Sequence, residues 1–351
     1  MKIVVLAGGI STERQVSLVS GTEICKALRS LGHRAVLVDL FLGLPDCGDP
    51  EKVFDAPDGL CSAFSIDRDA PSLEEVQRRR GGDPNCHIGP NVLALCAAAD
   101  LVFLGLHGQD GEDGKIQAAL SLMGIPFTGS SYLGSGMAMD KAVSKKIMEH
   151  CDVRTPAWQE LTVREADIPQ LAETLPMPCV VKTPAGGSSI GVFLPEDRAA
   201  LADALRTLLA FSPRVIIEAR IEGRELTVPV LGDDYLPAIE IVPPEGTYFD
   251  YVAKYQSGAD GAREICPAPI TEGEFREMGE MALRLHRALG LSVYSRTDFI
   301  LDREGTPWCL EINTLPGMTP ASLFPKSAAV LGITYPQLCE CIATLSLEVK
   351  R

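Results

Sequence analysis

One β-hairpin constrains this chain more than any other segment. Two apolar runs, 299–301 and 308–310, flank turn-forming residues at 302–305, and this pattern predicts two antiparallel strands joined by a short turn. Folding the two strands together would place Asp298 opposite Glu311. The hairpin therefore predicts that two carboxylates, distant in sequence, lie side by side.

Further polar side chains belong to the same hairpin. Because side chains alternate along a strand, Arg296 shares a face with Asp298, and Asn313 shares a face with Glu311. Two carboxylates and an amide are oxygen ligands of the kind that Mg²⁺ uses together with substrate phosphates. The alternative is a surface hairpin with solvated charges, and the hairpin alone does not decide between the two.

Length and charge narrow the class of protein. A chain of 351 residues is longer than an ordinary domain and predicts two or three domains. The formal net charge of -15 argues against a nucleic-acid partner, because the phosphate backbone attracts basic surfaces. An acidic protein can still bind ATP through a few lysines and Mg²⁺.

The cysteines and the hydropathy pattern favour the cytoplasm. The 11 cysteines are scattered without a C-x-x-C pair, which is typical of small buried side chains in a reducing compartment. No apolar run approaches the ~20 residues that a membrane helix needs, and no signal-peptide pattern follows Met1. We therefore expect a cytoplasmic protein without membrane insertion.

The first 130 residues read as an α/β domain with an open parallel sheet. A buried strand over 2–7 ends at a glycine pair, Ser11 or Thr12 is expected to cap the following helix, and a second strand covers 35–40. Further on, we expect a helix over 92–98, a strand over 101–106, a helix over 114–123 and a strand over 125–128. A dinucleotide fingerprint is missing from the glycine pair.

The segment 45–90 has little periodicity and reads as a long connection. We expect a hairpin around Val53 and Phe64, and a solvated turn at the three arginines 78–80. No functional role follows from this segment.

Two further blocks follow, at 131–213 and 214–351. The second block contains a strand at 179–182, a glycine-rich loop and a return strand at 192–193. The third contains strands at 215–218, 225–231 and 238–242, a helix at 272–289, the hairpin and C-terminal helices. The predicted fold class is thus α/β for the first domain, followed by a two-lobed α+β part.

The glycine-rich loop predicts a phosphate-binding site. Lys182 ends a strand, and the loop from 183 to 191 carries glycines and hydroxyl side chains whose backbone and side-chain donors can approach an anion. The pattern differs from a Walker A loop. The alternative is an ordinary Gly/Ser turn.

Other candidates stand at strand or helix ends, where ligands of α/β proteins bind. Each also has a plain structural reading, such as a solvated surface charge or a turn. A loop at 248–261, rich in Tyr, Gly and Asp, has the length of an active-site lid. The candidates are Glu13, His107, Lys141, Glu218, Glu225 and, in the loop, Lys254 and Tyr255.

These residues, taken in order, resemble the D-alanine–D-alanine ligase family of the ATP-grasp superfamily over nearly the whole chain. One block alone would be weak, whereas all of them in order are specific. The matching blocks are Gly8-Gly9 with 13–17, His107-Gly108 with 111–114, 139–141, Lys182 with 187–189, Glu218 with Glu225, Tyr251 with 253–255, Arg296 with Asp298, and 311–317.

The resemblance implies an ATP-grasp fold for the last two blocks and a nucleotide site between them. Lys141, Lys182 and Lys254 would contact the phosphates of ATP, and Ser188 would also lie at this site. Glu218 and Glu225 would hold the adenine and ribose, with backbone contacts from Ala219 and Ile221. Two Mg²⁺ (or Mn²⁺) ions would be bound by Asp298, Glu311 and Asn313, with Glu311 bridging.

The resemblance also implies roles in catalysis and in amino-acid binding. Glu13 would hold the ammonium of the first D-alanine near His107, and would join Ser188 and Tyr255 in closing the lid. Arg296 and the Gly317 N–H would stabilise a tetrahedral oxyanion. Ser322 and Leu323 would bind the carboxylate of the second D-alanine.

A few positions depart from the usual family pattern, and none of them removes a catalytic group. Gln15 stands where a second acidic residue is frequent, Pro184 is displaced by one position after Lys182, and Ser295 precedes Arg296 where Gly or Ala is common. Tyr255 favours D-alanine over D-lactate as the second substrate.

The implied activity is ATP-dependent joining of two D-alanines through an acyl phosphate, for peptidoglycan precursor synthesis. The alternatives are an ATP-grasp ligase for other amino acids, such as D-Ala–D-Ser, and a non-catalytic nucleotide-binding protein. The intact Arg296 and metal-binding residues disfavour the last. A homodimer is expected because dimers are usual in the family.

Overall fold

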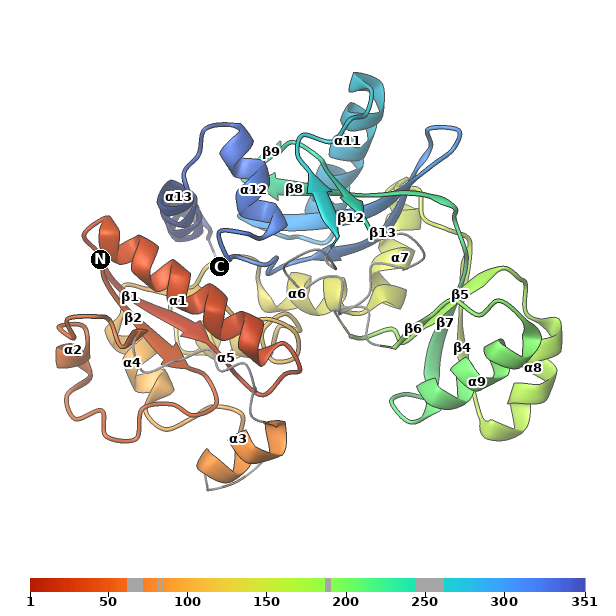
Figure 1. The fold of residues 1–351 in the computed structure, drawn as a ribbon. Coiled ribbons are helices and arrows are strands. Elements are labelled where there is room, and N and C mark those ends of the chain that lie inside the picture. The colour runs from red at the N-terminus through yellow and green to blue at the C-terminus, as the bar shows by residue number, and fades with distance from the viewer. Residues whose placement is uncertain (62–71, 81–82, 84, 187–190, 244–261, 351) are drawn as a thin grey trace.

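The computed structural model describes residues 1–61, 72–80, 83, 85–186, 191–243 and 262–350 (Figure 1). The strands are β1 (Lys2–Ala7), β2 (Arg34–Asp39), β3 (Leu101–Leu104), β4 (Trp158–Thr162), β5 (Cys179–Lys182), β6 (Val192–Phe193), β7 (Arg214–Ala219), β8 (Gly223–Leu231), β9 (Asp234–Tyr235), β10 (Ile239–Val242), β11 (Arg263–Ile265), β12 (Tyr294–Asp302) and β13 (Pro307–Asn313).

The helices lie between and around these strands. They are α1 (Arg14–Ser30), α2 (Pro50–Val53), α3 (Leu73–Arg80), α4 (Val92–Ala98), α5 (Lys115–Leu122), α6 (Tyr132–Met139), α7 (Lys141–His150), α8 (Ile168–Thr174), α9 (Arg198–Leu209), α11 (Glu272–Ala288), α12 (Leu323–Val330) and α13 (Tyr335–Glu348), with a short 3₁₀ turn η2 (Glu165–Asp167).

The N-terminal part is the expected parallel α/β unit. Its described strands pair in the order β2-β1-β3, and both pairings are parallel. Five of the six β1 residues are buried because the strand lies in the middle of the sheet. The helix expected at 92–98 is α4 with the same bounds. The strand expected at 125–128 is reduced to a single parallel bridge between Val102 and Phe127.

The expected cap of the first helix is wrong. Helix α1 begins at Arg14, and Glu13 occupies the N-cap position without a capping side-chain hydrogen bond. The Ser11 hydroxyl is used elsewhere, since its Oγ donates to the His107 carbonyl at 2.8 Å and accepts from the Glu13 N–H at 3.2 Å. The start of α1 is therefore tied to the loop after β3.

The segment 45–90 is more helical than its sequence suggests. Val53 ends the short helix α2, whose first turn is capped by the Asp49 carboxylate, so the hairpin expected there is wrong. Phe64 lies outside the described residues. The arginines 78–80 form the last turn of α3 rather than a loop, because Val76 anchors that helix in a small apolar cluster with Phe41.

The central block is a small antiparallel α/β lobe. Its strands pair in the order β4-β7-β5-β6, so β7 belongs to this sheet although the sequence pattern assigned that strand to the third block. Helices α8 and α9 contact each other and cover one side of this sheet, at the far end of the molecule from the N-terminus (Figure 1). The Asp197 carboxylate caps α9, as the sequence predicts.

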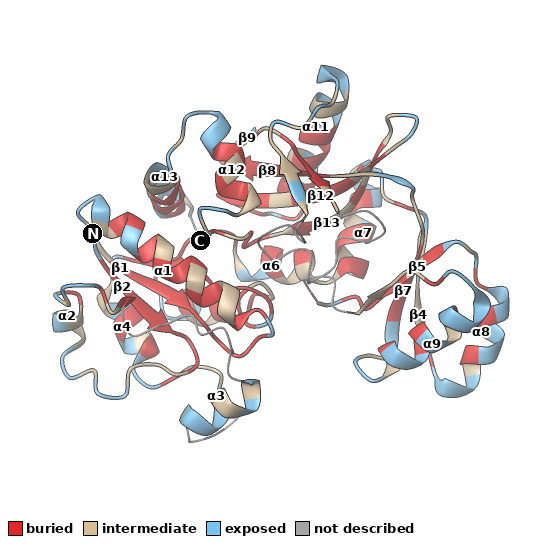
Figure 2. Ribbon diagram, viewed as in Figure 1, coloured by how far each residue is buried: buried red, intermediate tan, exposed pale blue. Residues whose placement is uncertain are grey.

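The C-terminal block is built on a larger antiparallel sheet. Its described strands follow the order β11-β10-β8-β12-β13, with β9 attached to β8. Helix α11 packs against β8 and β13, and a Thr271–Glu274 capping box fixes its start. The centres of the sheets are buried, and the outer helix faces are exposed (Figure 2).

The two ends of the chain share one core. Helix α13 packs against α1 and β3, and its Leu338 and Ile342 belong to the apolar cluster that contains β1 and β2 (Figure 1). In the described part of the chain, no single helix could span a membrane by length and composition; α12 and α13 pass that test only as a pair bent by 101°.

Candidate active site

The hairpin has the register that the sequence predicts. In the β12–β13 pairing, Arg296 lies opposite Asn313 and Asp298 lies opposite Glu311. An irregularity in the register follows directly after Asp298. Such a bulge bends a strand and re-aims its side chains, and bulges are frequent beside active sites. The polar residues therefore lie at the end of the hairpin where regular pairing is interrupted.

Asp298 is the centre of a dense hydrogen-bond network. Its carboxylate accepts two hydrogen bonds from the Arg296 guanidinium, both at 2.9 Å, one from Thr227 Oγ1 at 2.6 Å, and one from Asn313 Nδ2 at 3.0 Å. A charge-assisted pair of this two-pronged kind fixes orientation as well as distance. Asp298 is thus held rigidly although it is buried.

The residues around Asp298 fit a hard divalent cation. Asp298 and Glu311 supply carboxylate oxygens from paired positions, and the Asn313 amide donates its N–H to Asp298, a contact that fixes the orientation of the amide. Mg²⁺ and Mn²⁺ prefer such oxygen donors. Among the described residues, no cluster of three or more His, Cys, Asp or Glu side chains could hold a metal. The predicted metal ligands comprise only two carboxylates, and the third ligand is the amide of Asn313.

Lys141 joins the hairpin to the central lobe. It is the first residue of α7, which is capped by the Asp140 carboxylate. Its Nζ lies 3.1 Å from Glu311 Oε2 and donates to the Gly186 carbonyl at 2.6 Å. One lysine therefore contacts both a predicted metal ligand and the start of the glycine-rich loop.

A buried cluster of charges lies beside this lysine. The Glu218 carboxylate is 2.5 Å from Lys182 Nζ and 2.8 Å from Lys145 Nζ. Burial alone would raise the pKa of Glu218, but the ammonium groups of Lys182 and Lys145 lower it below its ordinary value. The two positive charges outnumber the one negative charge, so this cluster of three residues suits an anionic ligand.

The N-terminal domain contributes Glu13 and His107. Both are buried, and His107 Nε2 lies 3.1 Å from the hydroxyl of Ser20. Burial lowers the pKa of His107, while the negative charge of Glu13 opposes that shift. Gly108 has a φ of +69°, and a Cβ there would lie only 2.7 Å from a Glu13 oxygen, so this close approach requires glycine.

The loop after β3 holds the backbone of Leu315 in the C-terminal block. His107 Nδ1 lies 3.2 Å from the Leu315 carbonyl, and Glu112 Oε1 accepts from the Leu315 N–H at 3.4 Å. The other Glu112 oxygen accepts from the Gly108 N–H at 2.8 Å. Burial, together with the nearby Glu13 carboxylate, raises the pKa of Glu112 to about 8. The first domain thereby fixes the segment that leads to Gly317.

The remaining candidates of the C-terminal block follow that segment. A Cβ on Gly317 would lie 3.0 Å from Ser322 Oγ, so the two residues are in close contact. Ser322 is the N-cap residue and Leu323 the first residue of α12, where helix N–H groups can bind a carboxylate.

The residues predicted to bind the nucleotide lie on and between two strands that are consecutive in sequence but belong to different sheets. Glu218 and Ala219 end β7, Ile221 stands in the connection to β8, and Glu225 lies within β8. The structure thus places these four residues along one connection between the two lobes. Ser188, Lys254 and Tyr255 lie outside the described residues.

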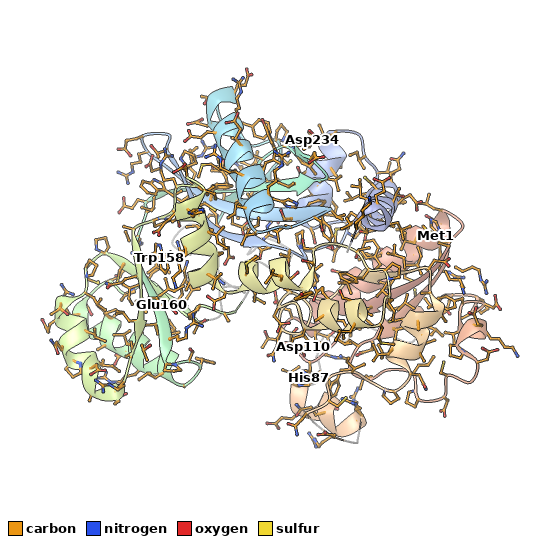
Figure 3. The ribbon with its side chains drawn as sticks, turned by 180° about the vertical axis from the view of Figure 1, so that it is seen from behind. Met1, His87, Asp110, Trp158, Glu160 and Asp234 are labelled. Atoms are coloured by element: carbon orange, nitrogen blue, oxygen red, sulfur yellow. The ribbon has the colours of Figure 1, made fainter. Side chains whose placement is uncertain are left out.

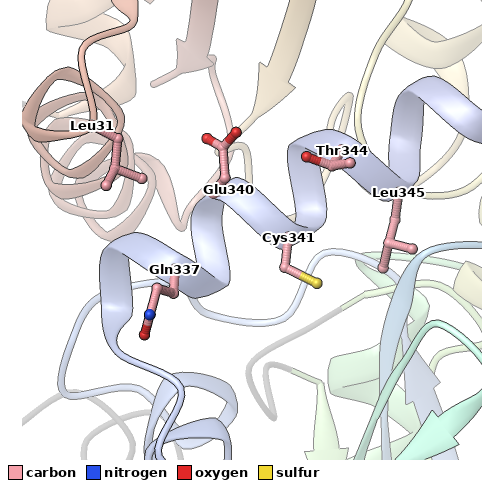
Figure 4. Close-up of a pocket in the computed structure, with 6 residues that line it drawn as sticks. All are labelled: Leu31, Gln337, Glu340, Cys341, Thr344 and Leu345. Carbon is pink, nitrogen blue, oxygen red and sulfur yellow. The ribbon is translucent and has the colours of Figure 1, made fainter.

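A pocket elsewhere on the molecule contains none of these candidates. It has a volume of about 380 Å³ and is lined by Leu31 and by five residues of α13: Gln337, Glu340, Cys341, Thr344 and Leu345 (Figure 4).

Two residues of the site were not singled out by the sequence. Lys145 is fully buried beside Glu218, and the only local signal was a lysine one turn after Lys141 on the same face of a helix. Glu112 was part of a matched block, yet nothing local indicated its contact with Leu315. Sequence patterns do not report a contact between residues about two hundred positions apart.

The family models that match are those of the two domains of one enzyme family. The D-ala D-ala ligase N-terminus model matches residues 2–130, and the D-ala D-ala ligase C-terminus model matches residues 146–344. The chain is similar to the D-alanine–D-alanine ligase of Pediococcus pentosaceus, with 44% identity over 97% of this chain and 96% of that protein. It is also similar to that of Synechococcus sp., with 39% identity over 97% and 92%.

Solved structures agree with these sequence matches. The crystal structure of D-alanine–D-alanine ligase from Bacillus anthracis complexed with ATP has a TM-score of 0.71 and 30% identity, covering 99% of this chain and 98% of that one. The enzyme from Coxiella burnetii, at 24% identity, shares the fold with a TM-score of 0.76, over 99% of this chain and 94% of that one. The chain described here therefore belongs to the D-alanine–D-alanine ligase family, whose structures have the ATP-grasp fold.

Proposed function

We propose that this protein uses ATP to join two D-alanines into D-alanyl-D-alanine, releasing ADP and phosphate, for peptidoglycan precursor synthesis. The observation that carries the proposal is the β12–β13 hairpin, where Arg296, Asp298, Glu311 and Asn313 meet in the predicted register. Lys141 contacts Glu311 from the central lobe. The groups proposed as a phosphate-binding lysine, metal ligands and an oxyanion donor are thus adjacent.

The nucleotide would lie between the two lobes. Lys141 and Lys182 would neutralise its phosphates, and Glu218, Ala219, Ile221 and Glu225 would hold its adenosine part. When bound, two Mg²⁺ (or Mn²⁺) ions held by Asp298, Glu311 and Asn313 would neutralise charge on the transferring phosphoryl group. The Arg296, Thr227 and Lys141 contacts keep these ligands oriented before metal arrives.

The amino acids would lie between the hairpin and the N-terminal domain. Glu13, beside His107, would hold the ammonium of the first D-alanine, whose carboxylate becomes the acyl phosphate. Ser322 and Leu323 would bind the carboxylate of the second D-alanine at the start of α12. Attack by its amine forms an oxyanion, which Arg296 and the Gly317 N–H would stabilise.

Water must be excluded, because it would hydrolyse an acyl phosphate. We assign that role to a lid in which Ser188, Tyr255 and Glu13 would be hydrogen-bonded, with Lys254 on the phosphates. The buried position of Glu13 supports its share in this closure.

Compartment and assembly are part of the proposal. A cytoplasmic location is supported by the eleven cysteines, all of them free thiols.

A homodimer is proposed, and exposed apolar side chains at Leu122, Tyr132 and Leu133 are candidates for its interface. Light scattering of the purified protein would measure the assembly directly.

The test is ADP and phosphate release by the purified enzyme with a panel of amino acids, with product mass read in parallel. D-alanine-dependent, Mg²⁺-dependent release and a D-alanyl-D-alanine mass are expected. Release with D-serine or another amino acid, but not with D-alanine alone, would instead identify a ligase of different specificity. ATP binding without release under any condition would identify a non-catalytic nucleotide-binding protein.

A further inference from the structure

The fully buried Lys145 has no part in the roles assigned so far. It lies one turn after Lys141 on α7, and its side chain is 0% exposed. Its Nζ lies 2.8 Å from Glu218 Oε2 and donates to Thr155 Oγ1 at 2.6 Å. Thr155 in turn donates to the Cys309 carbonyl at 2.8 Å. Lys145 therefore connects β7 of the central lobe with β13 of the C-terminal lobe.

The charges around Glu218 pose a problem for ATP binding. Lys182 is the closer of its two lysine partners, at 2.5 Å, and Lys182 is also the residue proposed to contact the phosphates. A lysine that turned from Glu218 to a phosphate would leave a carboxylate that is only 4% exposed. Removing one member of a buried ion pair is strongly unfavourable, because the remaining charge has no compensation.

Lys145 removes this problem. Since it binds the second oxygen of the same carboxylate, Glu218 keeps one counter-charge when Lys182 moves. The hydrogen bond to Thr155, which in turn donates to the Cys309 carbonyl of β13, holds Lys145 in place, so Lys145 has no need to move itself.

We propose that Lys145 is a positioning residue that acts as the permanent counter-ion of Glu218 and thereby releases Lys182 to bind the phosphates of ATP. The inference rests on the proposed ATP-dependent function. Loss of Lys145 should weaken the binding of the phosphates rather than of the adenosine part of ATP, because Lys145 acts through Lys182.

The first experiment compares ATP and adenosine binding by calorimetry or competition, using full-length enzyme with Mg²⁺. Lys145→Met is expected to weaken ATP binding by about tenfold or more, because Lys182 stays on Glu218. Adenosine binding is expected to change by no more than about twofold. Equal losses for ATP and adenosine would overturn the proposal, because they indicate a general distortion of the site.

The matched control is the next lysine of the same helix. Lys146 is exposed and pairs at 3.2 Å with Glu160, a surface residue of β4 that Figure 3 labels. Lys146→Met removes the same charge from α7 without touching Glu218. ATP binding is expected to stay within about twofold of the wild type, as for other exposed ion pairs.

A second experiment, in a Glu218→Gln background, tests whether Lys145 acts through the charge of Glu218. It remains informative even if the single variant Lys145→Met does not fold. Glu218→Gln removes the buried negative charge, so Lys145→Met made in that background is expected to cause no further loss of ATP affinity beyond about twofold. A further tenfold loss in the double variant would overturn the proposal. If the wild type binds ATP and Lys145→Met binds it equally well, only this inference fails; if the wild type does not bind ATP, the proposed function fails as well.

Discussion

At the scale of single residues, the site consists of carboxylates that are each held by a fixed partner. Asp298 is fixed by Arg296 and Thr227, Glu311 by Lys141, and Glu218 by two lysines. Such pairs contribute little net stability when buried, but they orient the groups before ligands bind. Substitution of the partly exposed Glu311 is therefore expected to affect turnover more than folding, whereas removing one partner of a fully buried pair is expected to destabilise the fold as well.

Glu311 provides the first test. Glu311→Gln is expected to lower the rate of ADP release by about a thousandfold or more, because several kcal/mol of charge stabilisation is lost with the proposed bridging metal ligand. The melting temperature should change little, since Glu311 is partly exposed and an ion pair of that kind is weak. Glu304→Gln, in the exposed turn of the same hairpin, is the control. Full activity in the Glu311 variant would refute the metal-binding role.

Glu112 gives a pH-dependent test. Its pKa is raised to about 8 from 4.5, so the folded protein holds this proton more tightly than the unfolded chain. Stability from this group is fully present below pH 4.5 and is lost as pH rises through about 8. Glu112→Gln should therefore become more stable relative to the wild type as pH rises through that window, measured by thermal unfolding. The exposed Glu196→Gln should show no such trend; a flat difference for Glu112→Gln would contradict the assignment.

At the scale of elements, the position of a side chain on its strand or helix decides what it contacts. The β12–β13 pairing brings the predicted metal ligands together, and α7 carries Lys141 and Lys145 one turn apart. The 45–90 segment was interpreted least well from the sequence. This segment is linked to the loop after β3 by His87, whose Nδ1 lies 2.5 Å from Asp110 Oδ2, and Figure 3 labels both residues.

His286 tests the packing of α11 on β12. Its side chain is buried, and its Nδ1 lies 2.7 Å from Ser295 Oγ. Burial lowers its pKa to about 4 from 6.5, so its stabilising contribution is present above pH 6.5 and is lost as pH falls toward 4. The loss amounts to about 3 kcal/mol at the lower limit. Urea unfolding of His286→Asn should be less sensitive to acid in this range, whereas the exposed His150→Asn should behave like the wild type.

At the scale of the whole molecule, the N-terminal and C-terminal segments of the chain pack into one core. Helix α13 completes the core of the N-terminal sheet by packing on α1 and β3. The loop after β3 in turn holds the Leu315 backbone through His107 and Glu112. The first domain and the C-terminal block are therefore linked both through their core and at the active site.

This shared core makes a prediction for α13. Ile342→Ala is expected to cost about 2–5 kcal/mol, as for other large-to-small changes of fully buried residues. It should also reduce the hydrogen-exchange protection of β1 and β3, although these strands are far away in sequence. Leu347→Ala removes an exposed side chain of the same helix and should change neither quantity. Destabilisation confined to α13 itself would show that the core is not shared.

The sequence by itself determined the local features. It predicted α4, the glycine-rich loop at the end of β5, and the register of Asp298 with Glu311, because turn residues and strand alternation act over short distances. It missed α2 and α3, since short helices between polar residues depend on a few tertiary contacts such as Val76 against Phe41. Its hypotheses for Ser188, Lys254 and Tyr255 remain predictions.

Only the tertiary structure decided which charges face one another. The Lys145–Glu218 pair joins α7 to β7, and the contact of Glu112 with Leu315 joins the first domain to the C-terminal block. No periodicity marks such pairs, because their geometry depends on how whole sheets pack rather than on the adjacent residues. The sequence thus proposed the chemical groups of the site, and the packing of the three blocks determined their partners and their pKa values.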